Sequence, residues 1–229
     1  MSEKFESIKK SIVDKACVKQ DVFAITKSVF SDLKEVLSDL TNDLHEFIDP
    51  TDSRVLVELQ SSEACEAHLT LGGDTVIFHM HTNVFAFPES HMIHKNSYVS
   101  KTPANAYCGV INIYNFLTDS FKYNRMNDVG YLVGRIFVNR ERHFFVEGKK
   151  QLGFLFNDFA TEELNKEALR SVVETSLQYV IDFDLYTPPY EKVNIVTVEN
   201  VQQLSQNLRL KTGKRLGFRF ESEENEINF

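Results

Sequence analysis

The segment HFFVEGK, residues 143–149, closes an apolar run with a carboxylate, Glu147, and, two residues later, an amine, Lys149. These two groups could form a catalytic pair that holds a metal ion. They could instead be the polar end of a β-hairpin, with no chemistry of their own. The two alternatives predict different neighbours for the Glu147 side chain, so its partner decides between them.

The same segment resembles the hhh-E-x-K strand of the restriction-endonuclease-like, or PD-(D/E)xK, nucleases. The resemblance implies that Asp128 and Glu147 hold a divalent cation, and hard oxygen ligands of this kind suit Mg²⁺. It also implies that the cation polarises a phosphodiester of a nucleic acid and that Lys149 helps to activate the attacking water. Catalysis by these three residues, a Mg²⁺ cofactor and a nucleic-acid partner are expected only through this resemblance.

A hairpin gives Glu147 a structural role instead. If Asn139 pairs with His143, Arg135 lies directly opposite Glu147, and a shift of one residue would place Gly134 there and send apolar side chains to mismatched faces. The same register matches apolar residues throughout: Val138 with Phe144, Phe137 with Phe145, and Ile136 with Val146. An arginine among apolar neighbours needs an acceptor, which Glu147 would provide.

Residues 122–150 are basic within an acidic chain. The net charge of the whole chain is -8, but the stretch from Lys122 to Lys150 has seven bases and three acids, which is +4, so the remainder has -12. The overall charge disfavours non-specific attraction to nucleic acid or to an anionic membrane. The basic stretch suits a small anionic ligand or an acidic protein partner. The candidate binding residues are Lys122, Arg125, Arg135, Arg140 and Arg142.

Common catalytic signatures are missing from the sequence: it has no G-x-S-x-G elbow, Walker loop, G-x-G-x-x-G or H-E-x-x-H motif. We therefore expect a non-catalytic ligand-binding, protein-binding or regulatory domain without a cofactor, and a Mg²⁺-dependent nuclease is the alternative. His79 and His81 lie two apart on a predicted strand, so both imidazoles share one face. Because no third ligand is in register with them, we predict no metal site.

The beginning of the chain, MSEKFESIKK, is charged where a secretory signal would be apolar, and no apolar run approaches the ~18 residues that a membrane span needs. The three cysteines, Cys17, Cys65 and Cys108, have no C-x-x-C spacing and are expected to be buried thiols. The charged start and the absence of a long apolar run predict a cytoplasmic protein that does not enter a membrane.

Two helices are predicted at the N-terminus, as a helical hairpin. Phe5, Ile8, Ile12 and Ala16 mark the first, and an apolar stripe from about Asp21 to Ile48 marks the second. At 1.5 Å per residue the second helix would be roughly 40 Å long, more than the sheet needs. We therefore expect part of it to pack on a second copy of the chain in a homodimer.

Segments with a period of two follow, which predicts a mostly antiparallel sheet, with the two strands around RER, residues 140–142, in its centre. A third helix is predicted after Asp158, with Thr161 as its N-cap. A strand at VNIVTV (193–198), a short helix after Asn200 and an edge strand at LGFRFE complete the prediction. The expected fold is α+β in a single domain, 1–229, with a helical segment at 1–50, a core at 51–220 and an acidic tail at 221–229.

Overall fold

Six strands form one sheet in the order in which they occur in the sequence, β1-β2-β3-β4-β5-β6, and each neighbouring pair is antiparallel. The computed structural model describes residues 2–48, 52, 54–183, 187 and 189–199. The strands are β1 (Val57–Gln60), β2 (Glu66–Leu71), β3 (Asp74–Met80), β4 (Gly109–Leu117), β5 (Tyr131–Val138) and β6 (Phe144–Gly148). The predicted α+β fold with a mostly antiparallel sheet is confirmed.

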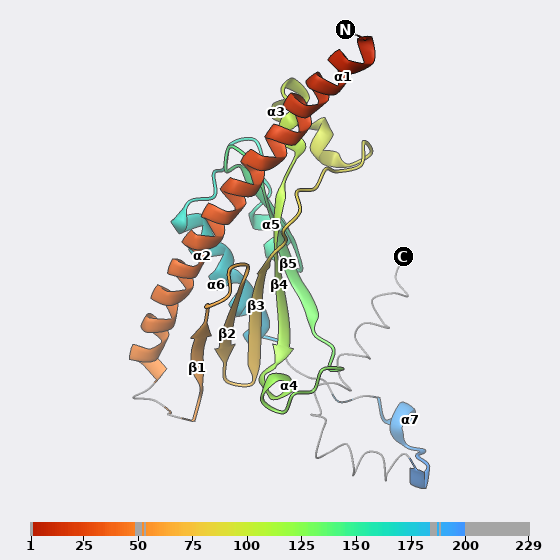
Figure 1. Cartoon of the computed structure of the whole chain (residues 1–229). Coiled ribbons are helices and arrows are strands. Elements are labelled where there is room, and N and C mark those ends of the chain that lie inside the picture. The colour runs from red at the N-terminus through yellow and green to blue at the C-terminus, as the bar shows by residue number, and fades with distance from the viewer. Residues whose placement is uncertain (1, 49–51, 53, 184–186, 188, 200–229) are drawn as a thin grey trace.

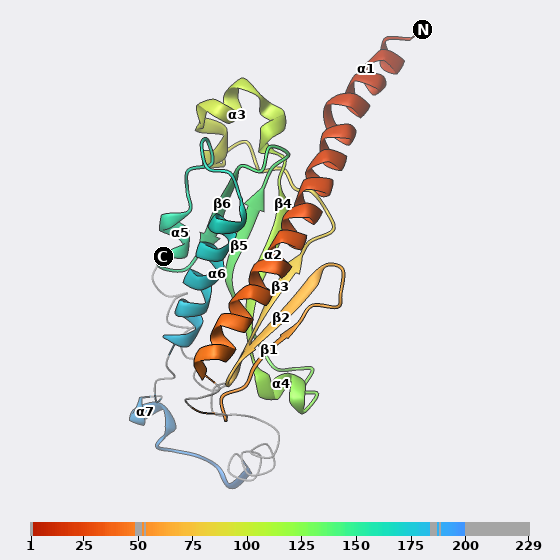
Figure 2. The same cartoon turned by 90° about the vertical axis from the view of Figure 1, so that its left-hand side faces the viewer.

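Two helices, α2 (Val18–Ile48) and α6 (Lys166–Ile181), lie side by side over one face of the sheet, as Figure 2 shows. Alternate strand residues point toward them: on β3, Val76, Phe78 and Met80 pack in one buried cluster with Phe30 of α2. Each large apolar side chain buried in this way stabilises the fold by about 1.5–3 kcal/mol. The remaining strand residues point to the opposite side, which we call the outer face.

The short helices lie in the connections between these elements. They are η2 (Met92–Lys95), α3 (Ser97–Lys101), η3 (Pro103–Ala106), α4 (Thr118–Lys122), α5 (Leu152–Leu155) and α7 (Tyr190–Val193). Segment 85–106, which contains η2, α3 and η3, covers one end of the outer face through a second buried cluster that includes Ile93, Phe137 and Phe145. Among the described residues no helix combines the length and the apolar character needed to cross a membrane.

A single rod replaces the predicted helical hairpin at the N-terminus. Helix α1 (Glu3–Ser11) continues through one π-helical segment, η1 (Ile12–Cys17), into α2 without a turn. The reason is in the sequence, because residues 3–48 contain no glycine or proline that would break the helix. Figure 1 shows the N-terminal part of the rod extending beyond the ends of the strands.

The unpaired apolar surface of the rod lies before Asp21. The structure buries no residue of α1 or η1, and Phe5, Ile8, Ile12 and Val13 are exposed there. Helix α2, by contrast, buries its apolar stripe against the sheet and α6, with Phe47 exposed near its end. Most of the exposed apolar surface of the rod is thus found on α1 and η1, before the segment for which the sequence predicted self-association.

Helix α6 begins later than predicted. Its N-cap is Asn165, whose Oδ1 accepts a hydrogen bond of 2.8 Å from the Ala168 amide. The predicted cap, Thr161, donates its hydroxyl to Asp158 at 2.6 Å. Residues 162–164 cannot be helical because they pair with the β5–β6 hairpin: the Leu164 amide, for example, donates to the carbonyl of Arg142 at 2.8 Å.

Two strand predictions need correction. The segment VNIVTV does not form a strand: α7 ends at Val193, and Ile195 and Val198 are exposed beyond it. Strand β6 lies at the end of the sheet order and not in its centre, although segment 156–162 covers its free edge, with a hydrogen bond of 2.8 Å from the Val146 amide to the carbonyl of Phe156. The helix predicted after Asn200, the strand at LGFRFE and the acidic tail lie outside the described residues.

Self-association through α1 and η1 stays a prediction, and it has a direct test. We expect light scattering at micromolar concentration to give the mass of a dimer, because contiguous exposed apolar surface tends to be buried against a partner. The double substitution Ile8→Ser, Ile12→Ser should give a monomer. Phe47→Ser, which removes an exposed apolar side chain at the other end of the rod, should leave the dimer intact. A monomeric wild type would contradict the prediction.

Candidate functional site

A row of polar side chains crosses five strands on the outer face. The sheet register places Glu66 opposite His79, His79 opposite Asn112, Asn112 opposite Arg135, and Arg135 opposite Glu147. The last pairing and the three apolar pairs beside it are those predicted for the β5–β6 hairpin, so that register is confirmed. The row brings side chains from distant parts of the sequence to one surface.

A pocket of about 400 Å³ lies above the β4–β6 end of this row. Asn112, Arg135, Glu147 and Phe137 line it from the sheet, and segment 81–91 lines it from the other side. The volume lies within the range of sites that hold small molecules. Most of the lining is aromatic or aliphatic, with a few polar groups at the sheet, which is also typical of such sites.

Aromatic contacts and backbone pairing fix the wall opposite the sheet. Phe85 forms an isolated β-bridge with Cys108, with hydrogen bonds of 2.8 and 3.0 Å between their backbones. The ring of Phe87 packs 5.2 Å from that of Phe137, and His91 stacks on Phe87 at 4.5 Å. These contacts hold an aromatic wall over the polar row.

Arg135 and Glu147 form an ion pair at the floor of the pocket. The guanidinium also lies 5.3 Å from the centre of the Phe137 ring, and the other Glu147 oxygen is 3.9 Å from Nε2 of His91. The side chains of Arg135 and Glu147 are 44% and 38% exposed. The pair is therefore half-exposed on the pocket floor, where no helix covers the sheet, and contributes less to stability than a buried pair would.

Asn112 is the polar group of the pocket that the sequence prediction missed. The residue is only 9% exposed, yet its side-chain amide has no hydrogen-bond partner within the described part of the chain. The amide itself is not sealed from solvent, because it faces the pocket that the residue lines. A polar residue flanked by Ile111 and Ile113 is the sequence signal that could have identified it.

Arg135 is the only one of the five predicted binding residues that lines the pocket. The others have local roles: Lys122 lies over the ring of Tyr123 at 5.5 Å, and Arg140 is 3.6 Å from Glu141.

Two of these arginines tie segments together. Arg125 is largely buried, 3.7 Å from both Asp119 and Asp128. Arg142 donates to the carbonyl of Leu164 at 2.8 and 3.1 Å and to Asp32 at 2.6 Å, which ties the hairpin to α2 and to the start of α6.

The three residues of the nuclease prediction do not share one location. Lys149 lines a smaller hollow of about 290 Å³ with Arg135 and Glu147. Asp128 accepts a hydrogen bond of 2.7 Å from Ser120, which follows β4, whereas Glu147 lies on the row that contains Asn112. Five residues of β4 separate Asn112 from its end at Leu117, roughly 16 Å at 3.3 Å per residue. Mg²⁺-dependent cleavage of nucleic acid stays a prediction.

His79 and His81 both belong to the outer side of the sheet, as predicted. Nδ1 of His81 accepts a hydrogen bond of 3.0 Å from the Asn83 amide, and its ring meets Phe85 edge-on at 4.7 Å. Within the described ranges no three His, Cys, Asp or Glu side chains are grouped so that they could hold a metal ion. His81 therefore enters the site as a lining residue of the pocket.

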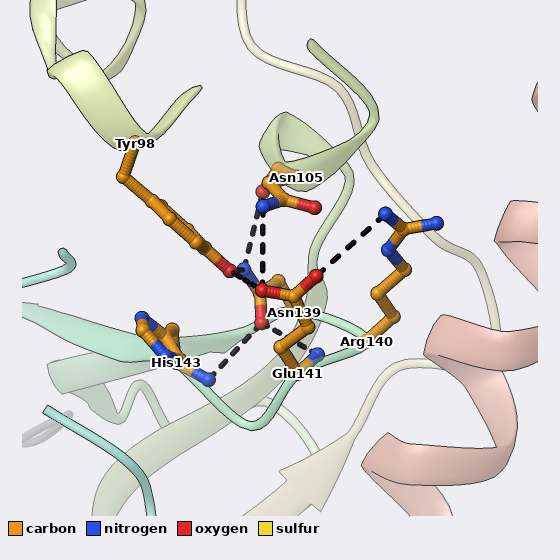
Figure 3. Close-up of polar contacts among 6 residues, drawn as sticks. All are labelled: Tyr98, Asn105, Asn139, Arg140, Glu141 and His143. Carbon is orange, nitrogen blue, oxygen red and sulfur yellow. Dashed lines mark hydrogen bonds and ion pairs between the residues drawn. The ribbon is translucent and has the colours of Figure 1, made fainter. Parts of the chain in front are cut away.

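A network that we call the turn clamp holds segment 85–106 to the β5–β6 turn (Figure 3). The Tyr98 hydroxyl donates to Glu141 at 2.6 Å and accepts from Nδ2 of Asn139 at 2.9 Å. Oδ1 of Asn139, which is fully buried, accepts from the amides of Glu141 and His143 at 2.9 and 3.0 Å. The Tyr98 ring stacks on His143 at 4.6 Å, so the clamp fixes the chain that supports the pocket wall.

Glu147→Gln should lower the free energy of unfolding by no more than about 1 kcal/mol, because the ion pair with Arg135 is half-exposed. Arg142→Met should cost about 2–3 kcal/mol, because it leaves the Leu164 carbonyl and Asp32 without their charged donor. Urea unfolding of both variants tests the difference. The nuclease prediction makes a further claim, that the wild type alone cuts DNA with Mg²⁺, and that result would assign Glu147 to catalysis.

Tyr98→Phe should lower the free energy of unfolding at neutral pH by about 1 kcal/mol, because Asn139 loses an acceptor. The pKa of Tyr98 is raised above its ordinary value of 10.0, chiefly by partial burial and secondly by the hydrogen bond to Glu141. The folded protein holds this proton more tightly than the unfolded chain, so the stabilisation is complete below pH 10.0 and is lost as the pH rises further.

The free energy of unfolding should therefore fall less at alkaline pH in Tyr98→Phe than in the wild type. Some alkaline loss remains in both proteins, because burial also raises the pKa of the Cys108 thiol. Urea unfolding at a series of alkaline pH values measures the loss of stability in each protein. Tyr107→Phe is the matched control, because the Tyr107 ring lies against Lys19 outside the clamp. Equal alkaline slopes for wild type and Tyr98→Phe would contradict the prediction.

No protein-family model, curated protein or solved structure matches this chain. Function therefore has to be argued from the site itself. Three features of the pocket bear on function: the aromatic wall, the ion pair and the Asn112 amide in its lining.

Proposed function

We propose that this protein is a non-catalytic binding domain that holds a small anionic molecule with a flat apolar body in the pocket on its outer face. The observation that carries the proposal is the side-chain amide of Asn112, which lines the pocket opposite Arg135 and has no hydrogen-bond partner among the described residues. An amide in this position can both donate and accept hydrogen bonds. A ligand that displaces water from it could make both.

The charges around the pocket favour an anion. One terminal nitrogen of Arg135 contacts Glu147, and the other N–H groups of the guanidinium have no acceptor within the described part of the chain. A guanidinium presents five N–H donors in a fixed plane, so those that remain suit a carboxylate. His81 and His91 also line the pocket and can donate, and among the described residues Glu147 is the single acidic one in the lining.

The wall of the pocket favours a flat apolar body. Phe85, Phe87 and Phe137 present rings to the pocket, and His91 extends this surface by stacking on Phe87. Offset and edge-on aromatic contacts add about 0.5–1.5 kcal/mol to the burial of apolar area. Glu147 is held by Arg135 and is not positioned as a free base, which supports a role in binding over one in catalysis.

A matched pair of probes tests the proposal: 3-phenylpropanoate and its neutral amide, 3-phenylpropanamide. Titration followed by NMR should show a dissociation constant on the order of a millimolar for the acid, a typical value for a ligand of this size, and much weaker binding of the amide. Shifts should be confined to residues around the pocket. Binding of neither probe would overturn the proposal, and equal binding of both would remove its anionic part.

Asn112→Leu gives a second test. The substitution should weaken binding of 3-phenylpropanoate about fivefold or more, and it should leave the free energy of unfolding unchanged or higher. A merely structural asparagine would behave differently. Asn115→Leu is the control: this asparagine is also buried, but its Nδ2 donates to Asp74 and Tyr131 at 3.0 and 3.2 Å, so its loss should destabilise the fold. Loss of stability in Asn112→Leu equal to that in Asn115→Leu would contradict a binding role.

A further inference from the structure

The pocket on the outer face continues into a second hollow. The hollow of about 290 Å³ shares Arg135 and Glu147 with the pocket and extends from them to Leu132 and Lys149. The two spaces therefore meet at the ion pair. A ligand with its apolar body against the aromatic wall and one anionic group at Arg135 would have this hollow directly beyond its charged end.

Lys149 supplies a second cation in that hollow. Its side chain makes no hydrogen bond or ion pair within the described ranges, and it lines the same space as Arg135. The next residue, Lys150, is directed elsewhere, since its amine lies over the ring of Tyr179 of α6 at 5.4 Å. Of these two adjacent lysines, Lys149 alone adds positive charge to the binding surface.

We propose that the ligand carries two separate anionic groups at one end, the first held by Arg135 and Asn112 and the second by Lys149. This inference rests on the proposed function and specifies its ligand class. The two cations stand at different positions along the hairpin, because Arg135 lies opposite Glu147 and Lys149 follows Gly148, the last residue of β6. The ligand is thus an amphipathic dianion whose charges are several ångströms apart.

Glu147 explains why two separate groups fit better than one compact dianion. Its carboxylate contacts Arg135 and lies in the lining of the hollow that contains Lys149. A single doubly charged group that touched both cations would approach this carboxylate and be repelled. Two groups that approach the cations separately can each gain a charge-assisted hydrogen bond and avoid Glu147.

The test compares 3-phenylpropanoate with benzylsuccinate, which is the same molecule with an added carboxymethyl arm. Isothermal titration of the full chain at low ionic strength should show benzylsuccinate binding about two- to fivefold more tightly, the gain expected from one exposed ion pair. The preference should fall as salt is added. In Lys149→Met the two probes should bind equally, and the affinity for 3-phenylpropanoate should be unchanged.

Lys150→Met is the matched control and should keep the wild-type preference for benzylsuccinate. Lys149→Arg, which keeps the positive charge, should retain most of that preference. Equal affinity of the wild type for the two probes, or a preference that survives Lys149→Met, would overturn the second anionic site and leave the proposed function standing. Failure of both probes to bind the wild type would overturn the proposed function itself. The two failures are therefore distinguishable.

Discussion

The register of the β5–β6 hairpin is the constraint on which the rest of the site depends. It sends Ile136 and Val146 into the core beneath the helices and Phe137 and Phe145 to the outer face, because neighbouring strand residues point to opposite sides. A slip of one residue would exchange these faces and bury Arg135. The same register that forms the core therefore also places a guanidinium at the outer surface.

The two faces of the sheet are covered in different ways. Helices α2 and α6 seal one face with apolar contacts, and this accounts for most of the burial in the molecule. The outer face is closed at one end by segment 85–106, which the turn clamp holds through the fully buried Asn139. Between that segment and the uncovered sheet, polar residues can reach solvent and apolar rings are still available. The pocket lies where these two conditions meet.

Prediction from the sequence succeeded where the determining contacts are local. Pairing in a hairpin depends on residues a few positions apart, so the partners of Phe145 and Glu147 followed from alternation alone. Two predictions failed within local segments: the N-terminal helices form a single rod, because residues 3–48 contain no glycine or proline, and VNIVTV has the period of a strand but forms none. Residues 162–164, by contrast, are extended because they meet the hairpin, which is a distant segment. The pocket wall was beyond prediction for the same reason, since the contact of Phe87 with Phe137 spans fifty residues of sequence.

Glu147 has the partner that the hairpin register predicts, and its pair with Arg135 is half-exposed. A fully buried ion pair would leave neither partner available, whereas a half-exposed pair leaves N–H groups of Arg135 open to the pocket. Glu147 orients the guanidinium and limits the positive charge that the empty site carries. It also occupies part of the acceptor position that a ligand's carboxylate would take, so it sets how strongly an anion must compete for Arg135. Under the proposed function, the same pair of side chains is both a structural contact and part of the recognition site.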